Sequence, residues 1–217
     1  MYLQTVEGLS PLAAGVQLVP LVAASALAAP CAAWLVGRWG RRTVATTALA
    51  LESVGLVLSL VVLADGVGPL LWLAMVLVGA GDGVALTTLV DSVLASAPAQ
   101  RAGAASAVSE TSFQLGNALG LAIIGSIVTY TYRAAIVLPA GLPPDVRSSV
   151  SDSVTTAVRV TEDDPDLTDV LPAALDAFHV AYAAAAGVAA ALLLTGSVLV
   201  RLTLPSQDAE RAAAGRG

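Results

Sequence analysis

The sequence contains a run of 25 apolar or uncharged residues, 12–36, with no charged side chain. A helix rises about 1.5 Å per residue, so such a run can cross the roughly 30 Å hydrocarbon core of a bilayer. Further apolar runs follow at 44–63, 70–94, 101–128 and 177–199. In lipid, a helix satisfies its own backbone hydrogen bonds. The sequence therefore predicts an all-α membrane protein with five transmembrane helices.

Composition supports this fold class and excludes several others. Of 217 residues, 57% are hydrophobic and 12% are charged, and the mean hydropathy is +0.82. Soluble domains carry about twice that share of charged residues. All basic residues are Arg, which we interpret as coding bias of a GC-rich genome and not as nucleic-acid binding. No P-loop, nucleophile elbow or HExxH motif is present, so we expect no enzymatic activity, cofactor or metal.

The apolar runs divide the chain into four parts. Residues 1–133 hold four transmembrane helices with short loops, and 177–201 form the last transmembrane helix. Between them, 134–176 is predicted to be an acidic loop outside the membrane that is partly helical, and its run EDDPDLTD has the composition of a disordered segment. Residues 202–217 are a polar tail.

The placement of arginines predicts the orientation. Seven arginines fall on one side of the predicted spans and three on the other: Arg38, Arg41, Arg42, Arg101, Arg201, Arg211 and Arg216 against Arg133, Arg147 and Arg159. Loops rich in Lys and Arg stay in the cytoplasm. We therefore predict that the N-terminus and the acidic loop lie outside, and that the C-terminus is cytoplasmic.

One face of the fourth span is polar. Ser106, Glu110, Gln114 and Asn117 follow one another at steps of four, four and three, which places them on one side of a helix. Interhelical hydrogen bonds would explain the two amides as well as a function would. An ionisable group inside a membrane is costly and usually functional, which favours a functional role for Glu110.

Two more acids, Glu52 and Asp82, lie near the predicted midplane. Either could hold a proton, because burial favours the neutral form of an acid, or could hold helices together by hydrogen bonds. Asp82 is flanked by glycines in GAGDG, which indicates a crowded helix interface. The small residues Gly116 and Gly120 likewise predict close approach of a neighbouring helix to the fourth span.

Four segments together resemble the C-terminal half of a major facilitator superfamily transporter: YLQTVEGLSPLAAG at 2–15, AAWLVGRWGRRTV at 32–44, LVGAGDGVAL at 77–86 and APAQRAGAASAVSETSFQLGNALGLAIIGSI at 97–127. The likeness is greatest to the fourteen-helix drug:proton antiporters (EmrB/QacA-like), in which RAGAASAV precedes a polar helix with QLG and ALG. The resemblance implies five helices of a C-terminal bundle, with a large external loop before the last helix.

The loop signature of this superfamily, G-x-L-x-D-R-x-G-R-R, is similar to AWLVGRWGRR in this sequence. Ala33 stands for its first glycine and Gly37 for its aspartate. The remaining positions fit the cytoplasmic loop motif: Arg38, Gly40, Arg41 and Arg42. The missing acid removes the charge relay that the family ascribes to this loop.

The resemblance also implies a function. It indicates a proton-coupled exporter of small amphipathic or cationic molecules in a bacterial plasma membrane, with its cavity between two helical bundles. The candidates for proton coupling or for the cavity are Asp82, Glu110, Glu52, Gln114 and Asn117. Less than half of such a transporter is recognisable, so we expect a truncated chain that is inactive without the missing N-terminal helices. The alternative is a non-transporting membrane subunit or anchor that binds a partner through its acidic loop.

Overall fold

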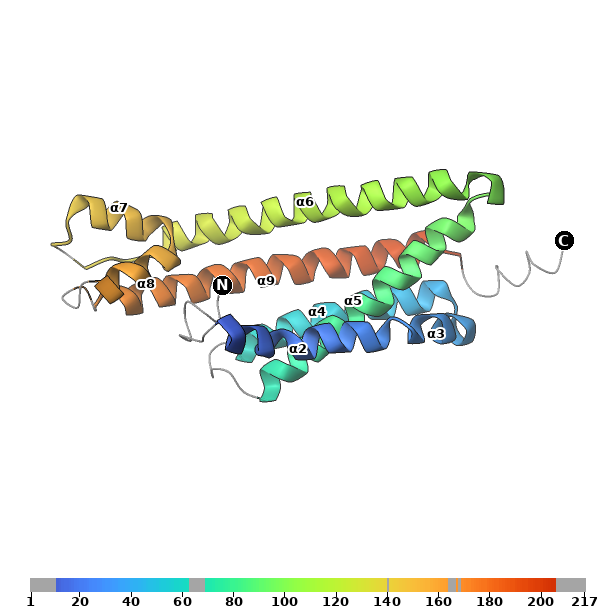
Figure 1. The fold of residues 1–217 in the computed structure, drawn as a ribbon, viewed down its shortest axis with the longest axis horizontal. Helices are drawn as coiled ribbons and strands as arrows, with labels where there is room; N and C mark the ends of the chain where they lie inside the picture. Colours follow the sequence, from blue (N-terminus) through green and yellow to red (C-terminus); the bar gives the residue numbers. More distant parts are fainter. Residues whose placement is uncertain (1–10, 63–68, 140, 164–166, 168, 206–217) are drawn as a thin grey trace. The chain divides into compact units, whose positions relative to one another are not determined.

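The computed structural model describes residues 11–62, 69–139, 141–163, 167 and 169–205 (Figure 1). This part of the chain is helical and contains no strand. Four helices are long and apolar enough to span a membrane: α4 (Arg41–Val62), α5 (Pro69–Ser96), α6 (Ala102–Ala135) and α9 (Val170–Thr203). A bent pair of shorter helices makes a fifth if it counts as one span. The predicted all-α membrane protein is confirmed.

The predicted first span is not one straight helix. It consists of α2 (Pro11–Ala28) and α3 (Cys31–Trp39), which meet at an angle of 54°. Pro20 lies inside α2 without ending it, whereas Pro30 immediately precedes α3. Proline has no N–H to donate, and its ring collides with the preceding turn. The break falls at Pro30, so the span predicted from 12 to 36 consists of two helices and not of one.

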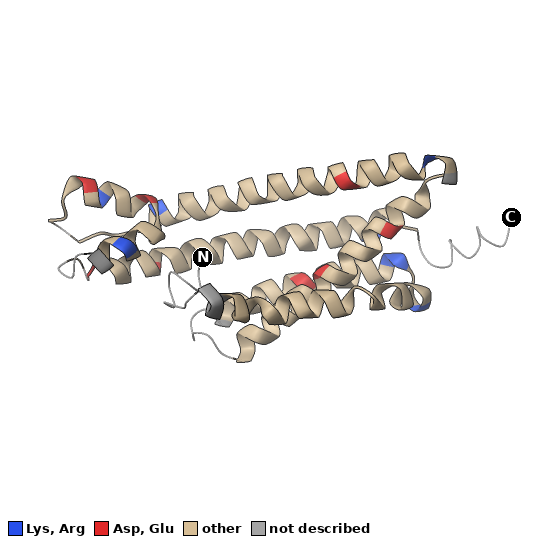
Figure 2. Ribbon diagram, viewed as in Figure 1, with Lys and Arg blue, Asp and Glu red and all other residues tan. Residues whose placement is uncertain are grey.

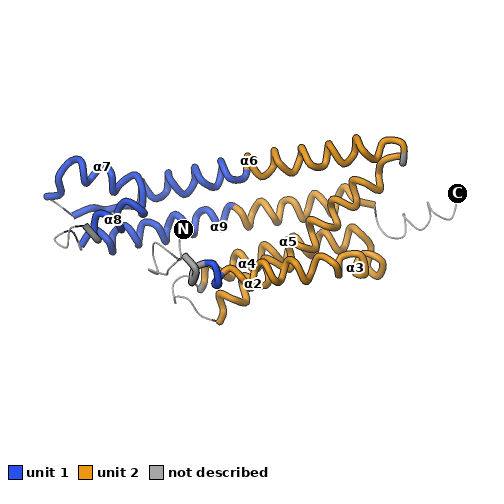
Figure 3. The backbone as a smooth tube through the Cα atoms, viewed as in Figure 1, with its two compact units in different colours: residues 1–17, 120–188 blue, residues 18–119, 189–217 orange. Residues whose placement is uncertain are grey.

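Two compact units make up the chain (Figure 3). Unit 1 comprises residues 1–17 and 120–188, and unit 2 comprises 18–119 and 189–217. Helices α2, α6 and α9 pass from one unit into the other, so each contributes a segment to both.

Unit 2 is built on the packing of α4 against α5. Its core contains small and branched side chains from α3, α4 and α5: Ala32, Val44, Ala48, Val84 and Ala85. A methyl group on Gly81 would lie 2.7 Å from the carbonyl oxygen of Ala48, so α4 and α5 touch backbone to backbone there. Methyl groups on Gly79 and Gly83 would collide with backbone carbonyls of α2. Small residues permit this close approach where lipid gives helices no hydrophobic reason to associate.

The crowded interface predicted around Asp82 is therefore present. The close approach predicted at Gly116 and Gly120 is not, because no atom of the described chain lies near a methyl group placed on either glycine. Spacing alone cannot distinguish the two glycine pairs, since each places a small surface on one side of a helix.

Unit 1 includes the segment 134–176, which was predicted to be an acidic loop with some helix. This segment contains α7 (Pro144–Asp152), α8 (Val154–Asp163) and the first turns of α9, which begins at Val170 and not at Ala177. Half of the acidic run 162–169 (residues 164–166 and 168) lies outside the described residues. We call α7 and α8 the cap helices. Their Val150 and Ala157 pack with Tyr132 and with the first turns of α9 in a buried cluster.

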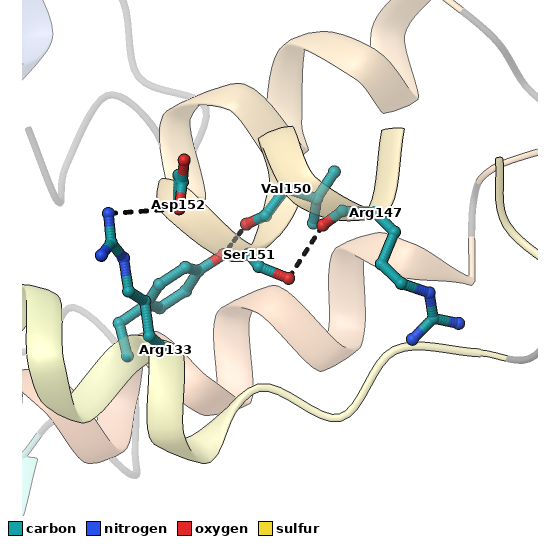
Figure 4. Close-up of polar contacts among 6 residues, drawn as sticks. Arg133, Arg147, Val150, Ser151 and Asp152 are labelled. Atoms are coloured by element: carbon teal, nitrogen blue, oxygen red, sulfur yellow. Dashed lines mark hydrogen bonds and ion pairs between the residues drawn. The ribbon is translucent and has the colours of Figure 1, made fainter. Parts of the chain in front are cut away.

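Polar contacts join the cap helices to the end of α6 (Figure 4). The Tyr132 hydroxyl donates a hydrogen bond to the carbonyl oxygen of Val150 at 3.0 Å, and both residues are buried. Arg133 forms an ion pair with Asp152 at 3.1 Å on the surface. The sequence reads as a loop because α7 is rich in serine and α8 mixes its valines with threonines and charged residues.

Candidate functional site

The carboxyl groups of Glu52 and Asp82 are neighbours in unit 2. Gly81, beside Asp82 on α5, packs so closely on α4 that a methyl group would lie 2.8 Å from the backbone nitrogen of Glu52. Glu52 is half-buried, Asp82 is exposed, and the two carboxyl groups interact electrostatically. The absence of a side chain at Gly81 thus creates the acid pair.

Helix α2 supplies a third polar group to this pair. The Ser25 hydroxyl donates a hydrogen bond to Oδ2 of Asp82 at 3.2 Å. The backbone of Ser25 lies directly against Gly83, which brings the hydroxyl within reach of the carboxylate one residue earlier in α5. We call Ser25, Glu52 and Asp82 the acid cluster. Its members come from α2, α4 and α5, respectively.

The polar face predicted on α6 is confirmed for two of its members. Gln114 Nε2 donates a hydrogen bond to Oε1 of Glu110 at 2.8 Å, as expected for side chains four residues apart on a helix. Both side chains are exposed, and so is Asn117. Acidic positions lie part-way along the long helices as well as near their ends (Figure 2). Within the described chain, no hydrogen bond or ion pair links Glu110 to the acid cluster.

The arginine turn has the sharp geometry that its sequence predicts. Gly40 separates α3 from α4 with φ of 80°, a conformation that glycine adopts without steric cost. Its N–H donates to the carbonyl oxygen of Val36 at 2.8 Å and ends α3. Arg38 lies in the last turn of α3, and Arg41 and Arg42 open α4. The turn therefore gathers three cations at one end of unit 2.

Sequence reasoning missed the serines that join helices in unit 2. The buried Ser53 hydroxyl donates to the carbonyl oxygen of Ala190 at 3.0 Å, and Ser197 donates to that of Thr46 at 3.0 Å. Both bonds link α4 to α9. A serine in an apolar helix is an available signal for such contacts, but its partner lies more than a hundred residues away in the chain.

Long apolar helices with acids at a packed helix interface define a polytopic membrane protein. Comparison with known proteins supports this class. The family model described as Major Facilitator Superfamily matches residues 2–143. This chain therefore belongs to the major facilitator superfamily.

Several relatives within the superfamily have names that state a function. The multidrug efflux pump LfrA of Mycolicibacterium smegmatis is 35% identical over 92% of this chain and 40% of its own length. The methyl viologen resistance protein SmvA of Salmonella typhimurium is 35% identical over 88% of this chain and 39% of its own. The drug efflux pump JefA of Mycobacterium tuberculosis is 30% identical over 73% and 30%, respectively. This chain thus spans about two fifths of the length of the first two relatives.

Proposed function

We propose that this chain is the C-terminal helical bundle of a proton-coupled drug exporter of the fourteen-helix antiporter subfamily. Its substrates would be small amphipathic or cationic molecules. Membership of the superfamily and the names of its relatives support export of drugs. The observation that carries proton coupling is the acid cluster, in which a half-buried and an exposed carboxyl group interact within the helix packing.

The acid cluster has the chemistry of a proton carrier. In the proposed mechanism, this pair of carboxyl groups takes up one proton and releases it during the transport cycle. A cationic substrate, or a rearrangement that brings another charge near, displaces that proton. Ser25 donates a hydrogen bond to Asp82 and so holds this carboxylate in place beside α2. Asp82 is exposed, so a proton can reach the pair from outside the helix packing.

The exposed polar face of α6 is the proposed wall of the substrate cavity. Glu110, Gln114 and Asn117 present a carboxylate and two amides on a surface that the described chain does not cover. An uncovered acid at this depth costs about 2.5–3.5 kcal/mol on insertion scales. Alternating access needs a second bundle that rocks against the first around the substrate. We propose that this second bundle covers the α6 face and that the chain alone does not transport.

The proposed location is a bacterial plasma membrane, with the cap helices outside and the C-terminus in the cytoplasm. This orientation follows from the arginine count. It places the arginine turn on the cytoplasmic side, next to the inner leaflet.

A chimera tests the transport proposal. Residues 1–217 replace the matching part of LfrA, and cells expressing the chimera or the 217-residue chain alone are loaded with the cationic dye ethidium. We expect the chimera to lower dye accumulation and a protonophore to abolish this effect, while the chain alone has none. Export by the chain alone, driven by the proton gradient, would contradict the need for a second bundle.

Substitutions on α5 test the role of the acid cluster. In the chimera, Asp82→Asn should reduce the proton movement that ethidium drives, with the protein still present in the membrane. Asp91→Asn is the matched control, because Asp91 is also exposed on α5 but nine residues away, on the opposite side of the helix. Equal proton movement in the two variants would leave Asp82 with a purely structural role.

A further inference from the structure

An apolar pocket of about 270 Å³ opens between α3, α4 and α5 beside the arginine turn. It is lined by Leu35, Trp39, Val44, Thr47, Ala48, Leu51, Ala80 and Val84. Two lining residues carry a polar group: Trp39 has an indole N–H, and the Thr47 hydroxyl donates to the carbonyl oxygens of Thr43 and Val44 in its own helix. The wall that the pocket offers a ligand is therefore largely apolar.

Two arginines lie where a polar head would sit at the mouth of this pocket. On α4, Arg41 is followed by Val44, Ala48 and Leu51 at helical spacing, so it occupies the end of the face that lines the pocket. On α3, Arg38 lies three residues after Leu35, within one turn of another lining residue. The chain turns at Gly40 between the two arginines.

The same two arginines have no partner in the described chain. Neither forms an ion pair or a hydrogen bond there, since the ion pair found joins Arg133 to Asp152. Arg38 is exposed and Arg41 is half-buried. Trp39 lines the pocket and is also 50% exposed, as an indole at a membrane–water boundary is. An apolar pocket, a boundary tryptophan and two unpaired cations thus coincide at one end of unit 2.

We propose that the apolar pocket, together with Arg38 and Arg41, binds an anionic phospholipid of the adjoining leaflet. An acyl chain occupies the apolar pocket, and the phosphate accepts hydrogen bonds from Arg38 and Arg41. Basic pockets between transmembrane helices hold anionic head groups in this way, and the planar guanidinium binds phosphate with two parallel hydrogen bonds. A volume of about 270 Å³ is below the roughly 300–1,000 Å³ of drug pockets, which favours a slender acyl chain over a drug.

Arg42 does not belong to this site, although it is the next residue. It lies about 100° further round α4, at the start of the face that carries Thr46 and Ser53. That face meets α9 through the hydrogen bonds of Ser197 and Ser53. Arg42 therefore has the same charge at the same end of α4 but faces away from the pocket, and it provides a matched control. The proposal needs only that the chain spans a membrane and does not depend on transport.

Quenching of tryptophan fluorescence by brominated lipids tests the site. The full chain, with Trp34→Phe and Trp72→Phe to leave Trp39 as its tryptophan, is reconstituted in phosphatidylcholine vesicles. A small fraction of the lipid is brominated phosphatidylglycerol in one series and brominated phosphatidylcholine in the other. We expect half-maximal quenching at a lower fraction of the anionic lipid. Arg38→Gln and Arg41→Gln should each weaken this preference roughly five-fold, as expected from about 1 kcal/mol per basic residue near an anionic surface.

Arg42→Gln should leave most of the preference for the anionic lipid intact. Thr47→Phe fills the pocket from its exposed side and should reduce quenching by both lipids. Circular dichroism and elution as a single species check that each variant is folded. Equal quenching by the two lipids, or equal loss in the Arg41 and Arg42 variants, would overturn the proposal. Absence of quenching by either lipid would also overturn it and would indicate that protein covers the pocket.

Discussion

Replacing Gly81 by Ala tests the packing that creates the acid cluster. The added methyl group would lie 2.7 Å from the carbonyl oxygen of Ala48 and 2.8 Å from the backbone nitrogen of Glu52. Both are backbone atoms of α4, so neither can move without a shift of the whole helix. Overpacking of this kind costs about 1–3 kcal/mol. Ala is favoured over Gly in a helix by about 1 kcal/mol, which offsets part of this cost.

The matched control is Gly116→Ala on α6, where nothing lies within 4 Å of the added methyl group. It gains the same helix propensity without the clash, so the difference between the two variants isolates the clash. We expect the free energy of unfolding of Gly81→Ala to be about 1–3 kcal/mol below that of Gly116→Ala. The measurement is unfolding of the purified chain in mixed micelles by increasing SDS, followed by circular dichroism.

The two variants should also differ at the acid cluster. A shift of α4 away from α5 separates Glu52 from Asp82, so the infrared carbonyl band of protonated carboxyl groups should change in Gly81→Ala and stay constant in Gly116→Ala. Equal unfolding free energies for the two variants would refute the reasoning, because they would show that α4 and α5 do not touch at Gly81.

Two further predictions concern unit 1 and the orientation of the chain. Tyr132→Phe removes the hydroxyl that donates to the carbonyl oxygen of Val150 and leaves a buried acceptor unsatisfied. The free energy of unfolding of the cap helices should therefore fall by about 1–3 kcal/mol, which faster amide hydrogen exchange in α7 would show. Unchanged exchange would count against this hydrogen bond. The orientation is tested in a variant without the native cysteine. Ser149→Cys on α7 should react with an impermeant maleimide in intact cells, and Ser96→Cys at the end of α5 should not. The opposite pattern would reverse the orientation predicted from the arginines.

Local patterns in the sequence determined most of the secondary structure. Apolar runs of sufficient length predicted the helices that span the membrane, since a helix is the one way for such a run to satisfy its backbone in lipid. The step of four residues predicted that Glu110 and Gln114 meet, because that distance is fixed inside a helix. Gly40 and the arginines beside it predicted the sharp turn for a similar reason, because the conformation of a turn depends on a few neighbouring residues.

The positions of the cap helices were harder to predict. Alternation of serines with single valines in 144–163 resembles a loop in composition, and the helices there gain stability from packing on Tyr132 and on the alanine face of α9. Short helices are marginal in water without such contacts. Their existence therefore depends on partners that are distant in the sequence.

The sequence by itself thus determined the fold class, the superfamily and the presence of acids in membrane helices. Only the tertiary structure decided which acids form a cluster. Gly79, Gly81 and Gly83 lie against other helices, whereas Gly116 and Gly120 face open space, although Gly79 and Gly83 have the same four-residue spacing as Gly116 and Gly120. The hydrogen bond from Ser25 to Asp82 spans 57 positions of the chain. A helix face is a local property, but the neighbour that it meets is set by the packing of the whole bundle, and no local pattern encodes it.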